Sequence, residues 1–442
     1  MSFYQSLLKV LPEVQGPSQK KLSFNQKLKW TLIMLIIFFV LGLIPLVGLG
    51  ANALSQFEFL SIVLAASFGS IISLGIGPIV TASIVLQLLN GSGIINFDTT
   101  TSEGKKQFQG TQKLLALFFI LFESFIFVFL GGLTPSAGFS PLLLVLQVLI
   151  GGFLIMLMDE VVSKWGFGSG LSLFIVAGVS QQIFVQTFSW TIPEGSAYTV
   201  GAFWRLLQAL FMDPNFVVAG GAFFSILATL VVFGLAVYAQ SMKVEIPLSF
   251  GRIRGHGIRW PLNFLYTSNI PVILVAALMA NIQLGAQFFS GGNAAISQWF
   301  SAPNILDGII TSSITLGVLL RALFYTLFMM IGAAVFSAFW VTSAGMDSKS
   351  QAKQMLSSGL QVPGFRRDKR ILERMLDRYI WPLALTGGLA VGLLAAIADL
   401  SGALSRGTGI LLAVMIVYKL YEEIAQQHMM DMNPMMRKFM GK

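Results

Sequence analysis

The sequence predicts an all-α, polytopic membrane protein with ten transmembrane helices, arranged as two inverted halves of five helices each. Of the 442 residues, 55% are hydrophobic and only 11% are charged, whereas a soluble domain has about 25% charged residues. The chain also contains ten separate apolar stretches that are long enough to cross a bilayer. Its basic residues gather beside alternate stretches, as expected for a chain that crosses the membrane repeatedly.

Segments rich in Gly, Pro and polar residues separate the ten stretches. The first stretch follows basic residues and ends in small residues, as a signal peptide does. Its apolar run of about 20 residues is longer than the 7–15 residues of a signal peptide, so we expect it to be retained. The predicted spans are 30–48, 71–90, 112–131, 140–158, 169–187, 217–239, 263–285, 321–341, 380–399 and 407–426.

The distribution of positive charge predicts the orientation of the spans. All but three of the 28 Lys and Arg residues lie on the side that holds both termini. The other side has only Arg205, Arg321 and Arg406. Because positively charged flanks remain on the cytoplasmic side of a membrane, we expect both termini to be cytoplasmic.

Ten spans divide into two groups of five, and the odd number gives the two groups opposite orientations. The second span of each group has a proline near its start and a late Gln, in "GPIVTASIVLQLL" (Gly77–Leu89) and "NIPVILVAALMANIQL" (Asn269–Leu284). Interrupted helices at matching positions of an inverted repeat point to the working site of a transport protein. Chance similarity between two apolar stretches is the alternative.

The segment from Leu54 to Ser70 is apolar but too short to span a bilayer. About 16 residues of helix reach about 24 Å, less than the roughly 30 Å hydrocarbon core. Glu58 lies within this segment, and a charge is costly in lipid. We therefore expect the segment to fold back into the protein, with Gly75–Pro78 as a flexible joint behind it. An interfacial helix in an external loop is the alternative.

Residues for enzymatic or metal chemistry are scarce. The chain has no cysteine, and its two histidines, His256 and His428, lie far apart in the sequence. The stretch "GFGSG" (Gly166–Gly170) does not match the Gly-x-Ser-x-Gly pattern, and no strand precedes it as a dinucleotide fingerprint requires. We expect no catalytic residue, no metal and no cofactor, and we interpret these glycines as a flexible loop.

Two predicted cytoplasmic loops, 242–261 and 345–378, are long and basic. The positive-inside rule alone explains the sign of their charge. The second loop has a cluster of positive charge that suits a phosphate-rich partner, whose binding would weaken with salt. We therefore predict docking there; the external segments 188–216 and 286–320 carry no comparable signal. The cluster comprises Arg366, Arg367, Lys369 and Arg370.

Polar side chains within the spans are few, and Thr81, Glu123 and Asn281 stand out. An acid inside a membrane span is by default a candidate functional residue. Hydrogen bonding among these three side chains would relieve the desolvation of Glu123 and fasten the short segment. A proton-coupled carrier would need more ionisable groups along a path, and the spans do not supply them.

Two pairs of apolar residues lie one helical turn apart, Ile76 with Val80 and Leu171 with Ile175. Such pairs usually pack in a core or contact lipid. If they line a path, the path has an apolar constriction, which cannot coordinate ions but seals by excluding water when it is empty.

Six stretches of the sequence resemble a known family, the SecY protein-translocation channels, most closely the archaeal form. The resemblance covers nearly the whole chain, and its motifs together are far more specific than any one of them. They are "LGIGPIVTASIVLQLLNGSGII" (Leu74–Ile95), "FQGTQKLL" (Phe108–Leu115), "DEVVSKWGFGSGLSLFIVAGVSQ" (Asp159–Gln181), "VEIPLSFGRIRG" (Val244–Gly255), "SNIPVILVAALMANIQL" (Ser268–Leu284) and "GTGILL" (Gly407–Leu412).

The resemblance implies a central hourglass pore between the two halves and a short re-entrant plug helix at about 54–66. It implies that Thr81, Glu123 and Asn281 form a polar cluster under the plug. The implied pore ring mixes Val80 and two leucines with isoleucines and comprises Ile76, Val80, Leu171, Ile175, Ile273 and Leu412. The implied plug residues are Gln56, Phe57, Glu58, Phe59, Leu60, Ile62 and Val63. The implied docking residues for a ribosome or a cytosolic translocation motor are Arg252, Arg254, Arg259, Arg366, Arg367, Lys369 and Arg370.

The family further implies the central pore-forming subunit of a channel that translocates unfolded secretory polypeptides and releases membrane helices sideways. The lateral gate would lie between spans 2–3 and spans 7–8, without catalytic chemistry. Implied partners are SecE-like and Secβ-like small membrane subunits, signal sequences, nascent polypeptides and the lipid of the cytoplasmic membrane. The expected domain boundaries are an amphipathic segment 1–29, an N-terminal half 30–187, a connection 188–216, a C-terminal half 217–426 and a tail 427–442. The rival interpretation is an inverted-repeat secondary transporter of a small solute.

Overall fold

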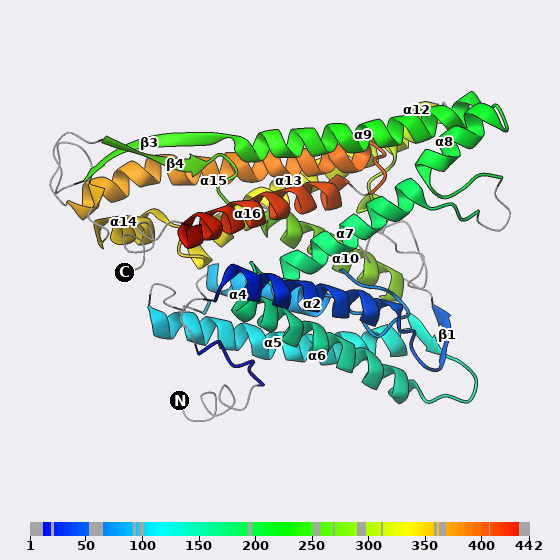
Figure 1. The fold of residues 1–442 in the computed structure, drawn as a ribbon, viewed down its shortest axis with the longest axis horizontal. Coiled ribbons are helices and arrows are strands. Elements are labelled where there is room, and N and C mark those ends of the chain that lie inside the picture. Colours follow the sequence, from blue (N-terminus) through cyan, green and yellow to red (C-terminus); the bar gives the residue numbers. More distant parts are fainter. Residues whose placement is uncertain are drawn as a thin grey trace.

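The computed structural model describes residues 12–18, 22–52, 65–91, 94–95, 97, 101–192, 197–250, 257–267, 270–289, 298–310, 313–357, 360–361, 368–405 and 407–432. Within these ranges, long helices run roughly side by side along the longest axis of the molecule (Figure 1). Each of the ten predicted spans falls on one of them. They are α2 (Phe24–Leu43), α4 (Gly77–Gly91), α5 (Ser102–Phe129), α6 (Pro141–Trp165), α7 (Gly170–Phe188), α9 (Phe216–Ser241), α10 (Ile270–Phe289), α13 (Leu316–Ser343), α15 (Lys369–Leu400) and α16 (Gly407–Met432).

Seven helices of the described part are long and apolar enough to cross a membrane, and α4 and α10 are shorter apolar helices. The chain is therefore a multi-pass membrane protein. Shorter elements cap the two ends of the bundle, with α14 and the β3–β4 hairpin at one end and β1, α8 and α12 at the other (Figure 1). They are β1 (Leu49–Asn52), β2 (Leu133–Pro135), α8 (Ala202–Phe211), β3 (Lys243–Phe250), β4 (Gly257–Asn263), α12 (Ile305–Ile310), α14 (Ser348–Ser357) and β5 (Leu360–Gln361).

The two basic segments predicted as loops join in one folded unit, which is a correction to the sequence analysis. A sheet of order β4-β3-β5 brings them together, and β3 pairs antiparallel with β5 through Ser249 opposite Gln361. Side chains of both segments share a small apolar core with α15, which includes Ile246, Leu262 and Leu372. Helix α15 also begins at Lys369, so the second basic segment ends as helix rather than loop.

A buried tyrosine fixes this unit to the membrane bundle. The hydroxyl of Tyr266, which lies between β4 and α10, donates a hydrogen bond to the carbonyl of Met346 at 2.8 Å. Burial, with a smaller contribution from the charge of Asp347, raises the pKa of Tyr266. The phenol therefore stays protonated and remains a hydrogen-bond donor in the physiological pH range.

The helix of the second span begins later than the predicted span, at its glycines and proline. Residues 71–76 form turns rather than the predicted first turns of a helix, and α4 starts only at Gly77. Gly69 and Gly75 have φ angles of 94° and 55°, which side chains disfavour. The turn segment is held by backbone hydrogen bonds from Leu46 to the carbonyl of Gly69 at 2.9 Å and from Ile71 to the carbonyl of Ile44 at 3.0 Å.

Small residues allow two helices of the C-terminal half to approach closely. A Cβ atom at Gly388 or Gly392 of α15 would lie 2.9 Å and 2.6 Å from the carbonyl oxygens of Ala333 and Met329 on α13. Glycines four residues apart lie on one helix face, and such a face is typical of tightly packed membrane helices.

The buried carboxylate of Asp399, near the end of α15, connects three helices. It accepts hydrogen bonds from the Tyr325 hydroxyl of α13 and from the start of α16 at Thr408.

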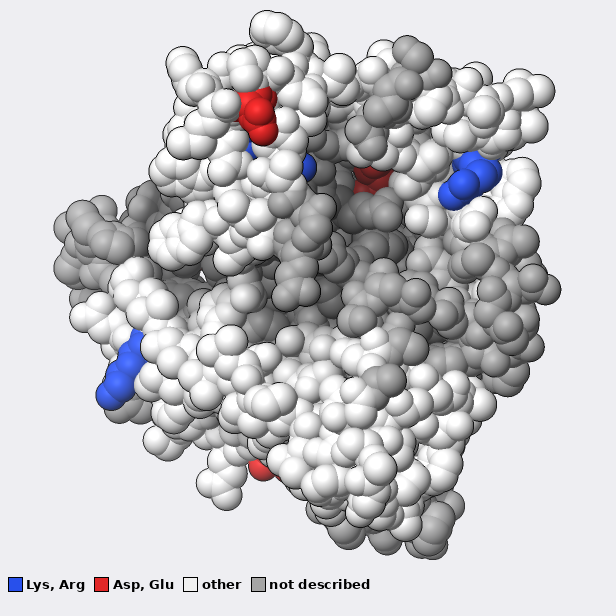
Figure 2. Space-filling model, turned by 90° about the vertical axis from the view of Figure 1, so that its right-hand side faces the viewer, with Lys and Arg blue, Asp and Glu red and all other residues white. Residues whose placement is uncertain are grey.

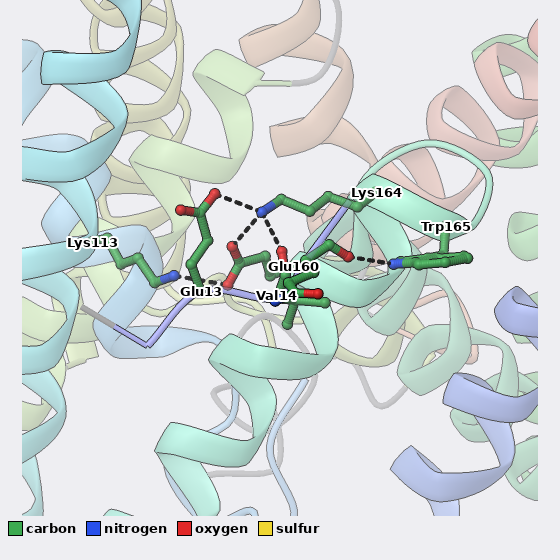
Figure 3. Close-up of polar contacts among 7 residues, drawn as sticks. Glu13, Val14, Lys113, Glu160, Lys164 and Trp165 are labelled. Atoms are coloured by element: carbon green, nitrogen blue, oxygen red, sulfur yellow. Dashed lines mark hydrogen bonds and ion pairs between the residues drawn. The ribbon is translucent and has the colours of Figure 1, made fainter. Parts of the chain in front are cut away.

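Residues 12–18, which we call the N-terminal strap, cross the end of α6 (Figure 3). The ammonium of Lys164 forms an ion pair with Glu13 at 2.7 Å and donates to the carbonyl of Val14 at 2.5 Å. Lys164 also pairs with Glu160 at 2.9 Å, and Glu160 pairs with Lys113 of α5 at 2.7 Å. The strap, α5 and α6 are therefore joined by one charged network at the end of the bundle.

Candidate pore between the two halves

A cavity of about 320 Å³ lies between the two halves, and helices of both halves line it. Val80 on α4 and Leu171 and Ile175 on α7 come from the N-terminal half, while Ile273 on α10 comes from the C-terminal half. These are four of the six residues predicted to form the pore ring. The structure thus brings residues almost 200 positions apart in the sequence to one apolar cavity wall.

The other two predicted ring residues do not line this cavity but are buried. Ile76, in the last turn before α4, and Leu412 on α16 are buried in the same central apolar cluster as Val80 and Ile175. Leu171 and Ile273 are partly buried against that cluster. Four of the six positions therefore line the cavity between the halves, and Ile76 and Leu412 are buried inside the bundle.

The wall of the cavity also contains polar and charged side chains. Gln87 late in α4 and Lys419 and Glu423 late in α16 line it together with Gln112 and Trp340. Trp340 lies near the end of α13 that leads toward α14, and Lys419 and Glu423 lie late in α16. The cavity, which we call the vestibule, therefore has both aliphatic and polar side chains in its wall.

Gln87 and the two charged residues of α16 were missed as site residues by the sequence analysis. The Gln87 amide donates to the Ser83 hydroxyl at 2.8 Å, and its buried carbonyl oxygen has no partner among the described residues. The late Gln of the second span was a visible signal for this position. For Lys419 and Glu423 the signal was their spacing of four residues, which places them on one face directly after an apolar stretch.

The predicted polar cluster is partly assembled. Asn281 on α10 donates from its amide to the hydroxyl of Thr81 on α4 at 3.2 Å, and that hydroxyl donates to the carbonyl of Gly77 at 2.9 Å. The carboxyl group of Glu123 on α5 lies within hydrogen-bonding reach of Thr81. Thr81 therefore lies between an acid of its own half and an amide of the other half.

The helices of the predicted lateral gate meet in this structure. Helix α4 contacts both α10 and α13 across the boundary between the halves. On the other contact between the halves, α7 packs against α16, and the Ser405 hydroxyl donates to the side-chain oxygen of Gln182 at 2.7 Å. The two halves are thus joined along two separate lines, with the cavity between them.

Most predicted plug and docking residues are not in the part of the chain that the structure describes. Lys369 and Arg370 are exposed at the start of α15, where the Asp368 carboxylate accepts a hydrogen bond from the Arg370 backbone at 2.9 Å. Arg259 lies in β4, of which only the backbone is described there. The predicted residues outside the described ranges are Gln56, Phe57, Glu58, Phe59, Leu60, Ile62, Val63, Arg252, Arg254, Arg366 and Arg367.

Within the described ranges, no group of three or more acidic or histidine residues is placed to hold a metal ion. The loop predicted at Gly166–Gly170 is present at residues 166–169, between α6 and α7, and Gly170 begins α7. Ser169 caps α7 through the backbone of Ser172, and the Asp159 carboxylate accepts from the backbone of Leu171 at 2.9 Å. These contacts fix the α7 end of the vestibule, including Leu171.

A multi-pass helical membrane protein whose halves enclose an apolar-lined cavity belongs to the class of pore-forming membrane proteins. A family model described as SecY matches residues 70–421, and one described as the plug domain of Sec61p matches residues 36–69. The chain therefore belongs to the SecY family.

Curated relatives and solved structures agree with this family over nearly the full length. Proteins named protein translocase subunit SecY are 45% identical in Methanothermobacter thermautotrophicus, over 99% of this chain and 98% of that protein, and 41% identical in Methanocaldococcus jannaschii, over 99% of both. A structure described as a protein conducting channel has a TM-score of 0.83 and 39% identity, covering 96% of this chain and 97% of that chain. Sec61 in the canine ribosome-channel complex has a TM-score of 0.79 and 38% identity over the same shares.

Proposed function

We propose that this chain is the central pore-forming subunit of a protein-conducting channel, which translocates unfolded polypeptides and releases membrane helices sideways. The single observation that carries the proposal is the shared apolar wall between the halves, formed by residues of α4, α7 and α10. Aliphatic side chains make no specific hydrogen bonds, so such a wall accommodates any passing side chain. It also disfavours water and ions when no chain is present.

In this proposal, Ile76, Val80, Leu171, Ile175, Ile273 and Leu412 form the ring that closes around a translocating chain. Residues 54–66 act as the plug, and Thr81, Glu123 and Asn281 support it from below. The match of residues 36–69 to a plug-domain model supports this assignment. Opening requires the plug to leave and the contacts of α4 with α10 and α13 to loosen.

A secondary transporter of a small solute is disfavoured by the same geometry. A solute carrier needs a polar pocket near the middle of the membrane with helix ends aimed at the solute. The wall of this cavity instead includes the aliphatic side chains of Val80, Leu171, Ile175 and Ile273. The relatives are named as translocase subunits and the matching structures as channels, which also favours the channel.

We infer that the chain lies in a cytoplasmic membrane with both termini on the cytoplasmic side. The sparse charge on the end that carries α8, shown in Figure 2, supports this orientation among the described residues. SecE-like and Secβ-like small membrane subunits complete the proposed complex. The folded unit of β3, β4, β5 and α14 carries basic residues to the cytoplasmic side, where a ribosome or a motor protein docks.

Site-specific photocrosslinking to a stalled secretory chain tests the proposed function. A photoreactive amino acid at Ile273 or Leu412 should crosslink the arrested chain, because Ile273 lines the cavity and Leu412 is buried inside the bundle. The matched controls are Leu230 on α9 and Leu323 on α13, which are large, apolar and exposed on the outer surface of the bundle. Crosslinks confined to the control positions would reject the proposal.

A further inference from the structure

Helix α8 forms part of the covalent connection between the two halves, because it follows α7 and precedes α9. One face of this helix packs on the protein. Ala202 and Leu206 join a small apolar cluster with Ala222 of α9 and Leu404, and Ala209 is also buried. These α8 residues are spaced by four and three positions, so they form a single stripe along the helix.

The remaining surface of α8 is apolar and exposed. Phe203 and Trp204 are both exposed, and the exposed fractions reach 78% for Phe211, 81% for Met212 and 83% for Phe216, where α8 turns into α9. Exposed aromatic side chains at the end of a membrane bundle are typical of the interface between lipid and water.

This surface is continuous with the lipid-facing surface of a neighbouring span. Phe188 at the end of α7 lies with its ring centroid 6.1 Å from that of Phe203 and 5.3 Å from that of Phe184. The indole N–H of Trp204 donates to the carbonyl of Phe188 at 3.0 Å. A row of exposed aromatic rings therefore runs without a break from a membrane span onto α8.

Arg205 adds a positive charge to this helix. Its Nε is buried and has no hydrogen-bond partner in the described part of the chain. The neighbouring polar side chain, Gln208, is already occupied, since its oxygen accepts from the backbone of Thr199 at 3.0 Å. Because the protein encloses the Nε, the remaining N–H groups of this partly exposed side chain are the ones that suit a lipid phosphate, which accepts charge-assisted hydrogen bonds.

We propose that α8 lies in the headgroup region of the leaflet opposite the β3–β4 hairpin, with Phe211, Met212 and Phe216 at the boundary of the acyl chains and Arg205 on a lipid phosphate. An amphipathic helix binds a bilayer surface through this combination of apolar area and charge. The connection between the halves is thereby held at a fixed depth while the halves move about it. This inference requires only that the chain spans a membrane, so it can fail while the proposed channel function stands.

The absence of cysteine from the sequence allows a direct depth measurement. The channel complex, carrying the single substitution Met212→Cys, is labelled with an environment-sensitive fluorophore and reconstituted into phosphatidylcholine–phosphatidylglycerol vesicles. The vesicles also contain lipids that carry a nitroxide, which quenches the fluorophore. The nitroxide lies either near the headgroup (the shallow nitroxide) or near the end of the acyl chain (the deep nitroxide). We expect the shallow nitroxide to quench the fluorophore about twofold more than the deep one, as for a helix at the interface.

Two further cysteine positions calibrate the measurement. Leu230→Cys, exposed in the middle of α9, should be quenched more by the deep nitroxide. Arg374→Cys, exposed on the cytoplasmic part of α15, should be quenched by aqueous iodide and by neither lipid. If the Met212→Cys label is open to iodide and reached by neither nitroxide, α8 lies in water and the proposal is wrong. Protection from iodide and from both nitroxides would mean that a partner subunit covers α8, which also overturns it.

The phosphate contact has its own test. In the Met212→Cys background, Arg205→Gln should reduce shallow quenching and increase iodide access, whereas Arg205→Lys should retain most of the quenching because it keeps the charge. Equal quenching of the Gln and Lys variants would reject the role of Arg205 in binding lipid phosphate.

Discussion

Thr81 on α4 and Asn281 on α10 are joined by a 3.2 Å hydrogen bond that crosses from one half of the molecule to the other. If the halves part, this bond must break. A net hydrogen bond stabilises a protein by about 1 kcal/mol, which corresponds to about a fivefold change in the ratio of closed to open channels.

We therefore predict that Thr81→Val and Asn281→Leu each increase ion conductance of the idle channel about fivefold in planar bilayers, because both remove the hydrogen bond that joins the two halves. A matched control is Thr326→Val. Thr81 and Thr326 both donate to the carbonyl four residues earlier, at 2.9 Å and 2.8 Å, but the Asn281 bond is made to Thr81. Equal conductance of the two valine variants would contradict the predicted closing role of the bond.

The ring makes a second prediction. Ile273 lines the cavity and is partly buried. Ile273→Asn should let water enter the apolar wall and raise idle ion flux about tenfold, whereas Ile273→Leu keeps the wall apolar and should leave the flux low. Flux into vesicles that contain the complex measures the difference. Equal flux through both variants would show that this wall is not the ion barrier.

The outcome for individual elements shows what the sequence can predict. The second span was predicted to begin at residue 71, and the later start of α4 at Gly77 follows from Gly75, Gly77 and Pro78, which mark a local break in the helix. The wall residues were named because the motifs resemble a known family, since the spacing of Ile76 with Val80 and of Leu171 with Ile175 left core packing and lipid contact open. Both signals lie within short stretches of sequence.

The features that were missed depend on distant partners or on short amphipathic patterns. The β3–β5 contact joins Ser249 to Gln361, and no local pattern predicts that pairing. Helix α8 was treated as part of an external connection because ten residues are too few for a span. Gln87 was noted only as part of a repeat, since a polar residue in a span does not show which way it faces.

Docking on the basic unit gives a third prediction. The double substitution Arg366→Glu and Arg367→Glu reverses both charges. It should weaken ribosome binding at least tenfold at moderate salt, since phosphate contacts dominate such binding. Lys349→Glu on α14, exposed in the same unit, controls for the general loss of positive charge. Binding that is unchanged at low and moderate salt would remove these two residues from the docking surface.

Close packing behind α4 gives a fourth prediction. A Cβ at Gly151 on α6 would lie 1.8 Å from the carbonyl oxygen of Ile71, in the turn segment before α4. Gly151→Ala must therefore displace that segment and should lower the free energy of unfolding by about 1–3 kcal/mol. Gly220→Ala on α9 is the control, because its Cβ would meet no atom within 4 Å. Equal thermal stability of the two variants in detergent would contradict the packing at Ile71.

The charged network at the N-terminal strap gives the last prediction, a double-mutant cycle between Lys164 and Glu160. Their 2.9 Å ion pair is largely shielded from solvent and shares Glu160 with Lys113 at 2.7 Å. Shielding reduces screening by salt, so we expect a coupling free energy of about 1 kcal/mol for Lys164→Met with Glu160→Gln. The pair of Lys243 and Glu422, at 3.4 Å and more exposed, is the matched control and should couple by close to zero. Unfolding in detergent at low and high salt measures both cycles.

Because Lys164 also binds Glu13 and the Val14 carbonyl, Lys164→Met should in addition expose the strap to protease. Equal coupling in both cycles, with the strap still protected, would mean that the network does not hold the strap against α6.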